Sequence, residues 1–350
     1  MQQQRTSEAL AVMSSVAYSP DGKSIAAARG MDNVVFIYDA RTLERIKVLL
    51  GKDESLSSIN YYARALSYSR DGALLATSGI DDSFILWDAA TGQESLRIPQ
   101  LKGAQDVAFS PTSDLLATAG PGENVILWEV SKGEPRAVLK GHSAAVTTVA
   151  FSPDGKLLAS GSEDKTVILW SVDAARQVST LGPLPRPVRS VSFSRDARML
   201  ATCDGEITHW TCDGEFKLWA LGIGSTPATL SEPVDIPSNV EVSTQVMSTL
   251  ALLTGHLSTG MRETGWGPAI FSPDGKHLAV KRGHIGFSGD YEIVILDLPS
   301  RKIVAHIFCQ CFGMAFSPDG TRLATAGHSA HGGPVQLWDV NTGKEVRSFH

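Results

Sequence analysis

The sequence contains little cysteine, no long apolar run and no excess of positive charge. Only 4 of its 350 residues are cysteine, which is too few for a disulfide scaffold in a chain of this length. No stretch of about 18 consecutive apolar residues occurs, so a membrane-spanning helix is not expected. Residues 1–20 lack the basic start and apolar stretch of a secretion signal. We therefore expect an intracellular, cytoplasmic protein, with the nucleus as the alternative location.

The charge balance disfavours nucleic acid as a partner. Lys and Arg number 31 against 37 Asp and Glu, which gives a net charge of −6. No run of Lys and Arg forms the basic stripe that a phosphate backbone requires. Hydrophobic residues make up 43% of the chain, with 32 Gly and 17 Pro, so a packed core with many turns is expected rather than disorder or a fibre.

One segment recurs along the whole chain: an aromatic residue followed by Ser-Pro-Asp-Gly. A period near 42 residues separates most of the copies, with intervals of 50, 41, 42, 42, 78 and 45 residues between the aromatic residues. Such a period indicates a repeat architecture, in which each unit buries its apolar surface by stacking on its neighbours. Complete copies begin at Tyr18, Phe151, Phe271 and Phe316, and eroded copies begin at Tyr68, Phe109 and Phe193.

The unit that begins near residue 146 indicates how a repeat folds. Residues 146–152 and 156–160 alternate between apolar and polar side chains, and Ser152-Pro153-Asp154-Gly155 is typical of a tight turn. A β-branched and aromatic run follows at residues 166–170, and residues 177–181 supply a fourth strand. Seven such units predict seven small antiparallel sheets, and a ring of seven removes the open ends.

The third strand of most units ends in a Leu-Trp pair, often followed by an acidic residue. In these motifs, over about residues 14–349, the chain resembles the WD-repeat β-propellers. The resemblance implies an all-β fold, a seven-bladed β-propeller with four antiparallel strands per blade. The motifs are Leu86-Trp87-Asp88, Leu127-Trp128-Glu129, Leu169-Trp170, Leu218-Trp219 and Leu337-Trp338-Asp339, with Tyr38-Asp39 and Leu296-Asp297 as weaker copies and Gly-His pairs at Gly141-His142 and Gly255-His256.

We expect a single propeller domain over residues 1–350. Residues 221–246 read as an insertion on the bottom face, after the third strand of the fifth blade; a fourth strand at residues 226–231 would instead move the insertion to the top. Residues 344–349 can form the last outer strand, so closure of the ring is expected to rest on packing between the first and last blades. The blades are expected at residues 14–50, 65–100, 105–140, 146–182, 188–254, 268–308 and 312–349.

The resemblance also implies a buried hydrogen-bond chain of His, Ser or Thr, Asp and Trp in each well-formed blade. Only the fourth blade has every member, namely His142, Ser160, Asp164 and Trp170. The same residue types form hydrolase triads, but fragments of the set recur in other blades without the histidine, which favours a structural role. We therefore expect no enzymatic activity and no catalytic residue, cofactor or metal.

Two further groups have residue types that can carry chemistry. His328 and His331 lie in a Gly-rich loop with no third metal ligand nearby, so a solvated loop is expected there. Cys309 and Cys311 flank one residue in what reads as one strand, which would point both side chains to the same face. We expect them to be small buried hydrophobic residues rather than redox groups.

Function is expected on the loops, because a ring of sheets presents many loops on a rigid support. In the resembled family, the loops between second and third strands and those between blades share one face, the top. The longer ones here are residues 204–212, 281–291 and 327–334, together with residues 51–64 and 255–267 between blades. They supply aromatic and Arg side chains of the kind that anchors interfaces, namely Tyr61, Tyr62, Arg64, Trp266, Arg282, Phe287 and Tyr291.

Together these features predict a non-enzymatic scaffold or adaptor that binds a protein or peptide through the loop face, as a monomer or as a subunit of a larger complex. Neither nucleic acid nor a membrane is expected as a partner. The alternative is a propeller that binds a small ligand or a metal in its central channel, with or without catalysis. That alternative needs convergent carboxylates or histidines, which the sequence does not display.

Overall fold

Antiparallel strands form the regular structure of this protein, as a computed structural model describes it. The description covers residues 13–29, 34–50, 65–78, 83–99, 104–120, 122–207, 212–213, 216–221, 266–285, 290–327 and 335–348. Within these ranges the secondary structure is all strand, and a helix of the length and apolarity needed to cross a membrane is absent from them. The fold class is therefore all-β.

Seven separate sheets follow one another along the chain, each with its strands paired in chain order. The first four blades are complete, with four strands each. Their strands are β1 (Met13–Tyr18), β2 (Ser24–Arg29), β3 (Val34–Asp39) and β4 (Arg45–Leu50); β5 (Leu66–Tyr68), β6 (Leu74–Ser78), β7 (Ser83–Asp88) and β8 (Glu94–Pro99); β9 (Asp106–Phe109), β10 (Leu115–Ala119), β11 (Asn124–Glu129) and β12 (Glu134–Lys140); and β13 (Val146–Phe151), β14 (Leu157–Ser162), β15 (Val167–Ser171) and β16 (Arg176–Leu181).

Among the last three blades, the fifth differs from the four-stranded pattern. Its described residues give a sheet of three strands, and a separate two-stranded hairpin lies between the second and third of them. The insertion expected at residues 221–246 lies outside the described residues from position 222 onward. The strands are β17 (Val188–Phe193), β18 (Met199–Asp204), β19 (Glu206–Ile207), β20 (Cys212–Asp213) and β21 (Phe216–Ala220); β22 (Trp266–Phe271), β23 (His277–Ile285), β24 (Asp290–Asp297) and β25 (Lys302–Cys309); and β26 (Cys311–Phe316), β27 (Arg322–Gly327), β28 (Val335–Asp339) and β29 (Glu345–Ser348).

The recurring Ser-Pro-Asp-Gly segment makes the turn between the first two strands of a blade. In the fourth blade, the Ser152 hydroxyl donates to Asp154 Oδ1 at 2.6 Å, and the Gly155 N–H donates to the Ser152 carbonyl at 2.8 Å. Gly155 has a φ of 70°, in the left-handed region that glycine adopts without steric cost. The sequence motif therefore fixes where each hairpin reverses.

The hydrophobic core lies between blades rather than within them. Leu127 of the third blade, for example, is fully buried in one cluster with Leu158 and Trp170 of the fourth. The second strand of each complete blade is almost entirely buried, as in β14, because both of its faces are covered by neighbouring sheets. A single blade could not bury these residues, so the blades are stable only as a stack.

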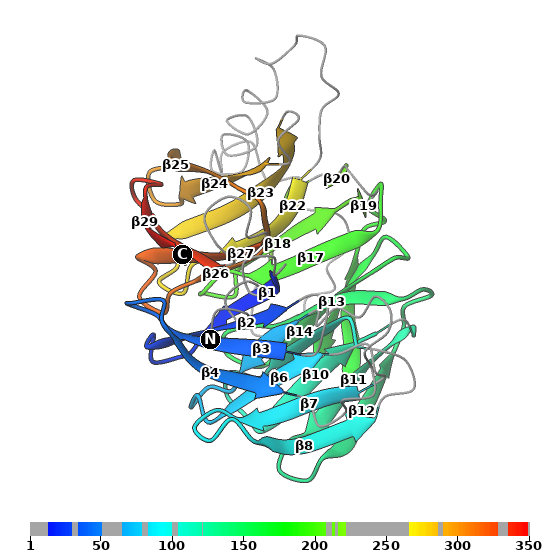
Figure 1. The fold of residues 1–350 in the computed structure, drawn as a ribbon. Helices are drawn as coiled ribbons and strands as arrows, with labels where there is room; N and C mark the ends of the chain where they lie inside the picture. Colours follow the sequence, from blue (N-terminus) through cyan, green and yellow to red (C-terminus); the bar gives the residue numbers. More distant parts are fainter. Residues whose placement is uncertain are drawn as a thin grey trace.

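The ring closes by packing between the first and last blades. Met13 and Phe36 of the first blade share an apolar cluster with Ala326 and Leu337 of the last. β1 packs against β26 and β27, and Figure 1 shows the blue first strands beside the red last ones. The last blade takes its outer strand, β29, from its own sequence, which pairs with β28. Residues 1–12 lie outside the described part.

Two sequence expectations are wrong in detail. Residues 281–291 are not one long loop, because β23 runs to Ile285 and β24 begins at Asp290. The polar and charged residues of this stretch suggested a loop, but their backbones pair across the two strands, from Lys281 with Ile293 to Ile285 with Asp290. Likewise, Cys309 and Cys311 belong to two strands of two different blades, with Gln310 between them.

Candidate functional site

The junction between the sixth and seventh blades brings several strand ends to the loop face. Strand direction alternates within a blade, so the end of β23, the start of β24, the end of β25 and the start of β26 all lie at the same edge. Only Gln310 separates β25 from β26, which makes this crossing shorter than the five-residue segment between β12 and β13.

Three of the seven predicted partner-binding residues lie in the sixth blade. Trp266 begins β22 and is paired with Arg282 in β23, so Trp266 lies in a strand and not in the expected loop. Tyr291 is the second residue of β24 and is half-buried. The other four, Tyr61, Tyr62, Arg64 and Phe287, lie outside the described residues, as do the side chains of Trp266 and Arg282.

A bulge near the start of the first strand exposes one extra side chain at the loop face in several blades. In three blades that side chain is polar and bonds back to a backbone carbonyl: Ser14 to Ala28, Thr147 to Gly161 and Arg189 to Gly205. In the seventh blade the bulge residue is Phe312, which has no polar group and is 44% exposed. Bulges often re-aim a side chain near a functional site.

Phe312 lies over a buried cation. The Lys281 ammonium is 3.9 Å from the centre of the Tyr291 ring and 5.7 Å from that of Phe312, and the two rings meet edge to face at 6.5 Å. Lys281 is only 8% exposed, so its charge is stabilised by these aromatic faces in place of water. We call Lys281, Tyr291, Cys309, Cys311 and Phe312 the junction cluster.

A close backbone contact holds the crossing in place. A Cβ atom added to Gly327, the last residue of β27, would lie 1.8 Å from the Gln310 carbonyl oxygen and 2.8 Å from Cys311 Cα. Those distances are shorter than any real contact, so only glycine permits this approach of β27 to the crossing. Gly327 therefore positions the cysteines and Phe312 at the edge of the sheet.

Sequence reasoning missed Lys281 and Phe312. Lys281 reads as a solvated loop residue, and its burial depends on the long β23–β24 hairpin. Comparison of the repeats could have identified Phe312, because Ser14, Thr147 and Arg189 occupy the matching position in other blades. An aromatic residue at a position that is otherwise polar is a departure from the repeat.

The four residues predicted as a structural network in the fourth blade lie together. Asp164 Oδ2 is 2.8 Å from His142 Nδ1, and His142 Nε2 is 2.8 Å from Ser160 Oγ. The Trp170 indole N–H donates to the same Ser160 oxygen at 2.8 Å. Burial raises the pKa of Asp164, but the hydrogen bonds from Thr166, Ser143 and His142 outweigh it and hold that pKa below its usual range.

These contacts join the same residue types as a hydrolase triad, but Ser160 is not accessible to a substrate. Ser160 has no exposed surface, and its oxygen already accepts a hydrogen bond from the Trp170 indole N–H. A nucleophilic serine must reach a substrate carbonyl, which Ser160 does not. The same indole-to-hydroxyl bond recurs, with threonine in place of serine, in four other blades: Trp87 to Thr77, Trp128 to Thr118, Trp219 to Thr202 and Trp338 to Thr325.

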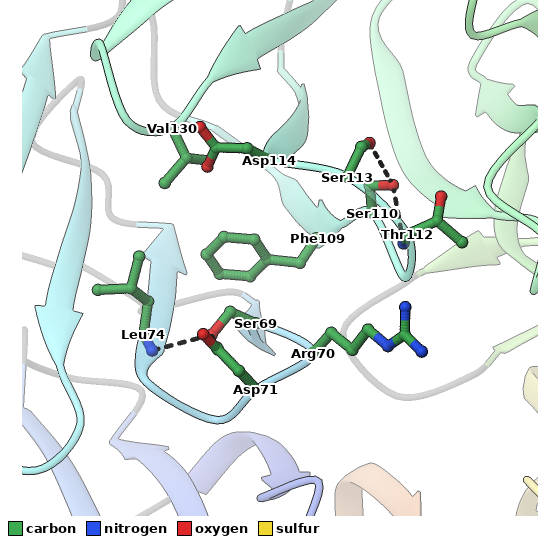
Figure 2. A pocket seen from close by; sticks show the side chains of 10 residues that line it. All are labelled: Ser69, Arg70, Asp71, Leu74, Phe109, Ser110, Thr112, Ser113, Asp114 and Val130. Carbon is green, nitrogen blue, oxygen red and sulfur yellow. Dashed lines mark hydrogen bonds between the residues drawn. The ribbon is translucent and has the colours of Figure 1, made fainter.

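A groove of about 470 Å³ lies on the opposite face, between the first turns of the second and third blades. Figure 2 shows the Phe109 ring pointing into it, near Leu74 and Val130. This volume is in the range of small-molecule sites. However, the hydroxyls of Ser69 and Ser110 are used inside the turns, where they accept hydrogen bonds from Leu74 N and from the Ser113 hydroxyl.

A metal site is not evident in the described part of the chain, where no three His, Cys, Asp or Glu side chains are grouped as ligands. His328 and His331, considered above, lie outside that part.

Comparison with known families identifies the repeat. The family model described as "WD domain, G-beta repeat" matches the chain at residues 5–39, 52–88, 133–171 and 176–219. No curated protein matches the chain. The matched stretches include neither β9 to β11 of the third blade nor the sixth and seventh blades.

Proposed function

The chain belongs to the WD-repeat β-propeller family, and from this premise we propose that it is a non-enzymatic scaffold that binds a protein or peptide through its loop face, at the junction of the sixth and seventh blades. Propellers of this family generally serve as protein-interaction scaffolds. The proposal includes a cytoplasmic location and a role as a monomer or as a subunit of a larger complex.

The exposed ring of Phe312 is the observation that carries the proposal. It is 44% exposed at the loop face, beside Tyr291 and over the Lys281 cation. Aromatic side chains dominate the binding energy of protein interfaces, and rings held by packing lose little conformational entropy on binding. Phe308, on the neighbouring outer strand, is 56% exposed and adds apolar surface near the same edge.

The test is affinity purification of the intact protein beside a Phe312→Ser variant, with proteins quantified by mass spectrometry. The matched control is Val138→Ser, because Val138 has a similar exposure of 46% but lies on β12 of the third blade. We expect Phe312→Ser to reduce recovery of a specific partner at least about tenfold, as a loss of some 1.4 kcal/mol would. Val138→Ser should retain it.

Recovery of the same proteins by both variants and by the unaltered chain would overturn the junction as the binding surface. Tyr62→Ser and Phe287→Ser extend the experiment to the candidates outside the described residues. Native mass spectrometry of the purified protein tests the alternative function, because a retained metal or small ligand would contradict a pure interaction role.

A further inference from the structure

The two cysteines of the junction cluster lie on either side of Gln310, in an apolar cluster made by the sixth and seventh blades. Cys309 ends β25 and is paired with Tyr291, whereas Cys311 begins β26 and is paired with Gly327. Both are free thiols, 5% and 2% exposed, and both belong to the apolar cluster that joins the sixth and seventh blades. Since a single residue separates them, they can react with one another without unfolding either sheet.

Their surroundings differ from those of an inert buried cysteine. A hydrogen bond between the Cys309 and Cys311 thiols, with help from the Lys281 cation, lowers the pKa of Cys311 despite its burial. The same bond and burial raise the pKa of Cys309. Cys311 is therefore the thiol of the pair that loses its proton more readily.

Lys281 supplies the charge that a buried thiolate needs. Its ammonium is almost fully buried against Tyr291 and Phe312, and it is paired with no carboxylate among the described residues. A cation in this position stabilises an anion more than it stabilises a neutral thiol. It also opposes binding of a metal cation to the same sulfurs.

We propose that Cys309 and Cys311 form a peroxide-sensitive dithiol, with Cys311 as the attacking group and Cys309 as the resolving group. The Cys311 thiolate attacks one oxygen of hydrogen peroxide, the O–O bond breaks, and the departing hydroxide takes up a proton to form water. The Cys309 sulfur then attacks the Cys311 sulfenic sulfur, the S–O bond breaks, and water leaves with the Cys309 proton. Two thiols are oxidised to one disulfide, and one peroxide is reduced to two waters.

This inference goes beyond the scaffold role and does not depend on it, because the chemistry needs no partner. Closing the disulfide would alter the crossing that positions Phe312, so the oxidation state would also change the loop face.

The test is oxidation of the purified, reduced full-length protein with hydrogen peroxide, followed by alkylation and peptide mapping. We expect a Cys309–Cys311 disulfide to form about tenfold faster than Cys203 is modified, because Cys203 is equally buried but packs with Val280, whose side chain points to the opposite face of β23 from Lys281. Cys309→Ser should stop at a sulfenic acid on Cys311, which a dimedone probe captures. Cys311→Ser should form neither product.

Lys281 gives the second set of variants. Lys281→Met should slow the first step, and Lys281→Arg, which keeps the positive charge, should largely restore it; circular dichroism confirms that each variant is folded. Equal reaction rates at Cys311 and Cys203 would overturn the proposal, as would a dimedone adduct on Cys309 in place of Cys311. Loss of partner binding by a variant in its reduced form, before any treatment with peroxide, would count against the scaffold role and not against the dithiol.

Discussion

His142 shows how one side chain can complete a blade. Its imidazole links Asp164, at the loop face, to Ser160 and through it to the buried Trp170 indole. The histidine side chain has no exposed surface, so each partner that loses its hydrogen bond would be left without water to replace it. The described residues of the other blades show only the Trp-to-hydroxyl part of this arrangement.

We expect His142→Ala to lower the free energy of unfolding by about 1–3 kcal/mol, since it leaves buried polar groups unpaired. Chemical denaturation followed by tryptophan fluorescence measures this change. Lys140→Ala is the matched control, because Lys140 is an exposed residue two positions earlier and should change stability by less than about 0.5 kcal/mol. Equal midpoints for both variants would mean that the network adds nothing to stability.

The glycine of the first turn is a second position where one residue matters. Gly72 has a φ of 72°, whereas the fifth blade places Ala197 at the same turn position with a φ of 57°. For a residue with a Cβ atom, this left-handed conformation costs about 1–2 kcal/mol.

Exchanging these two residue types should therefore have opposite effects. Gly72→Ala should destabilise the protein by about 1 kcal/mol, and its Cβ would meet only Pro20 at an ordinary 3.4 Å. Ala197→Gly should be neutral or stabilise by up to about 1 kcal/mol, because relief of strain exceeds the added entropy of the unfolded chain. Thermal melting of the two variants checks the pair, and stabilisation by Gly72→Ala would contradict the argument.

The turns act as a repeated element with a shared dependence on pH. In six blades the serine hydroxyl donates to the aspartate, at 2.7 Å for Asp21 and 2.6 Å for the other five. For Asp21, Asp71 and Asp319, this bond is the main cause that lowers the pKa. In the remaining three turns, burial opposes ionisation but hydrogen bonds outweigh it, so the pKa values of Asp154, Asp196 and Asp274 are also lowered.

A lowered pKa in the folded state makes these turns a source of acid sensitivity. Their stabilising contribution is complete above the ordinary value of 3.8 and is lost as the pH falls through the lower folded values. We expect the urea midpoint to fall steeply below about pH 4. The Asp71→Asn and Asp319→Asn double variant keeps the acceptor oxygens but cannot titrate, so its midpoint should fall less steeply. Parallel pH profiles would contradict this assignment.

The whole ring has one junction that the chain does not bridge, between the first and seventh blades. Leu337 packs there with Phe36 and Met13, and Arg347 donates to the Thr42 carbonyl at 3.0 Å. Every other pair of neighbouring blades is also joined by the chain, so among the described residues this junction relies on non-covalent contacts such as these.

Leu337→Ala should therefore loosen the ring at this junction. We expect a loss of about 2–5 kcal/mol, as for other buried leucines, and faster hydrogen exchange in β1 and β26. Leu127→Ala is the control, because Leu127 has the same place before a tryptophan in the third blade and is equally buried. Its variant should lose comparable stability without selective exchange in β1. Uniform exchange in both variants would mean that the first and last blades do not separate independently.

Much of the fold could be predicted from the repeat, because the turn and the Leu-Trp motif each encode local structure. Ser152 to Gly155 fixes a hairpin through bonds among neighbours, and Trp170 marks a strand that must be covered by other sheets. The candidate site was only partly predictable. Tyr291 was identified from its residue type, but Lys281 was not, because its burial depends on register between two long strands.

What the sequence by itself determined is the number of blades, their turns and the internal hydrogen-bond network of the fourth, since each follows from residues close together in one repeat or from the repetition itself. What only the tertiary structure decided is how repeats meet. The crossing at Gln310, the close approach of Gly327 to it and the contact of the Lys281 ammonium with the Phe312 ring all lie where the sixth and seventh blades meet. Contacts between sheets depend on packing geometry, which no single repeat contains, and the junction cluster is made of such contacts.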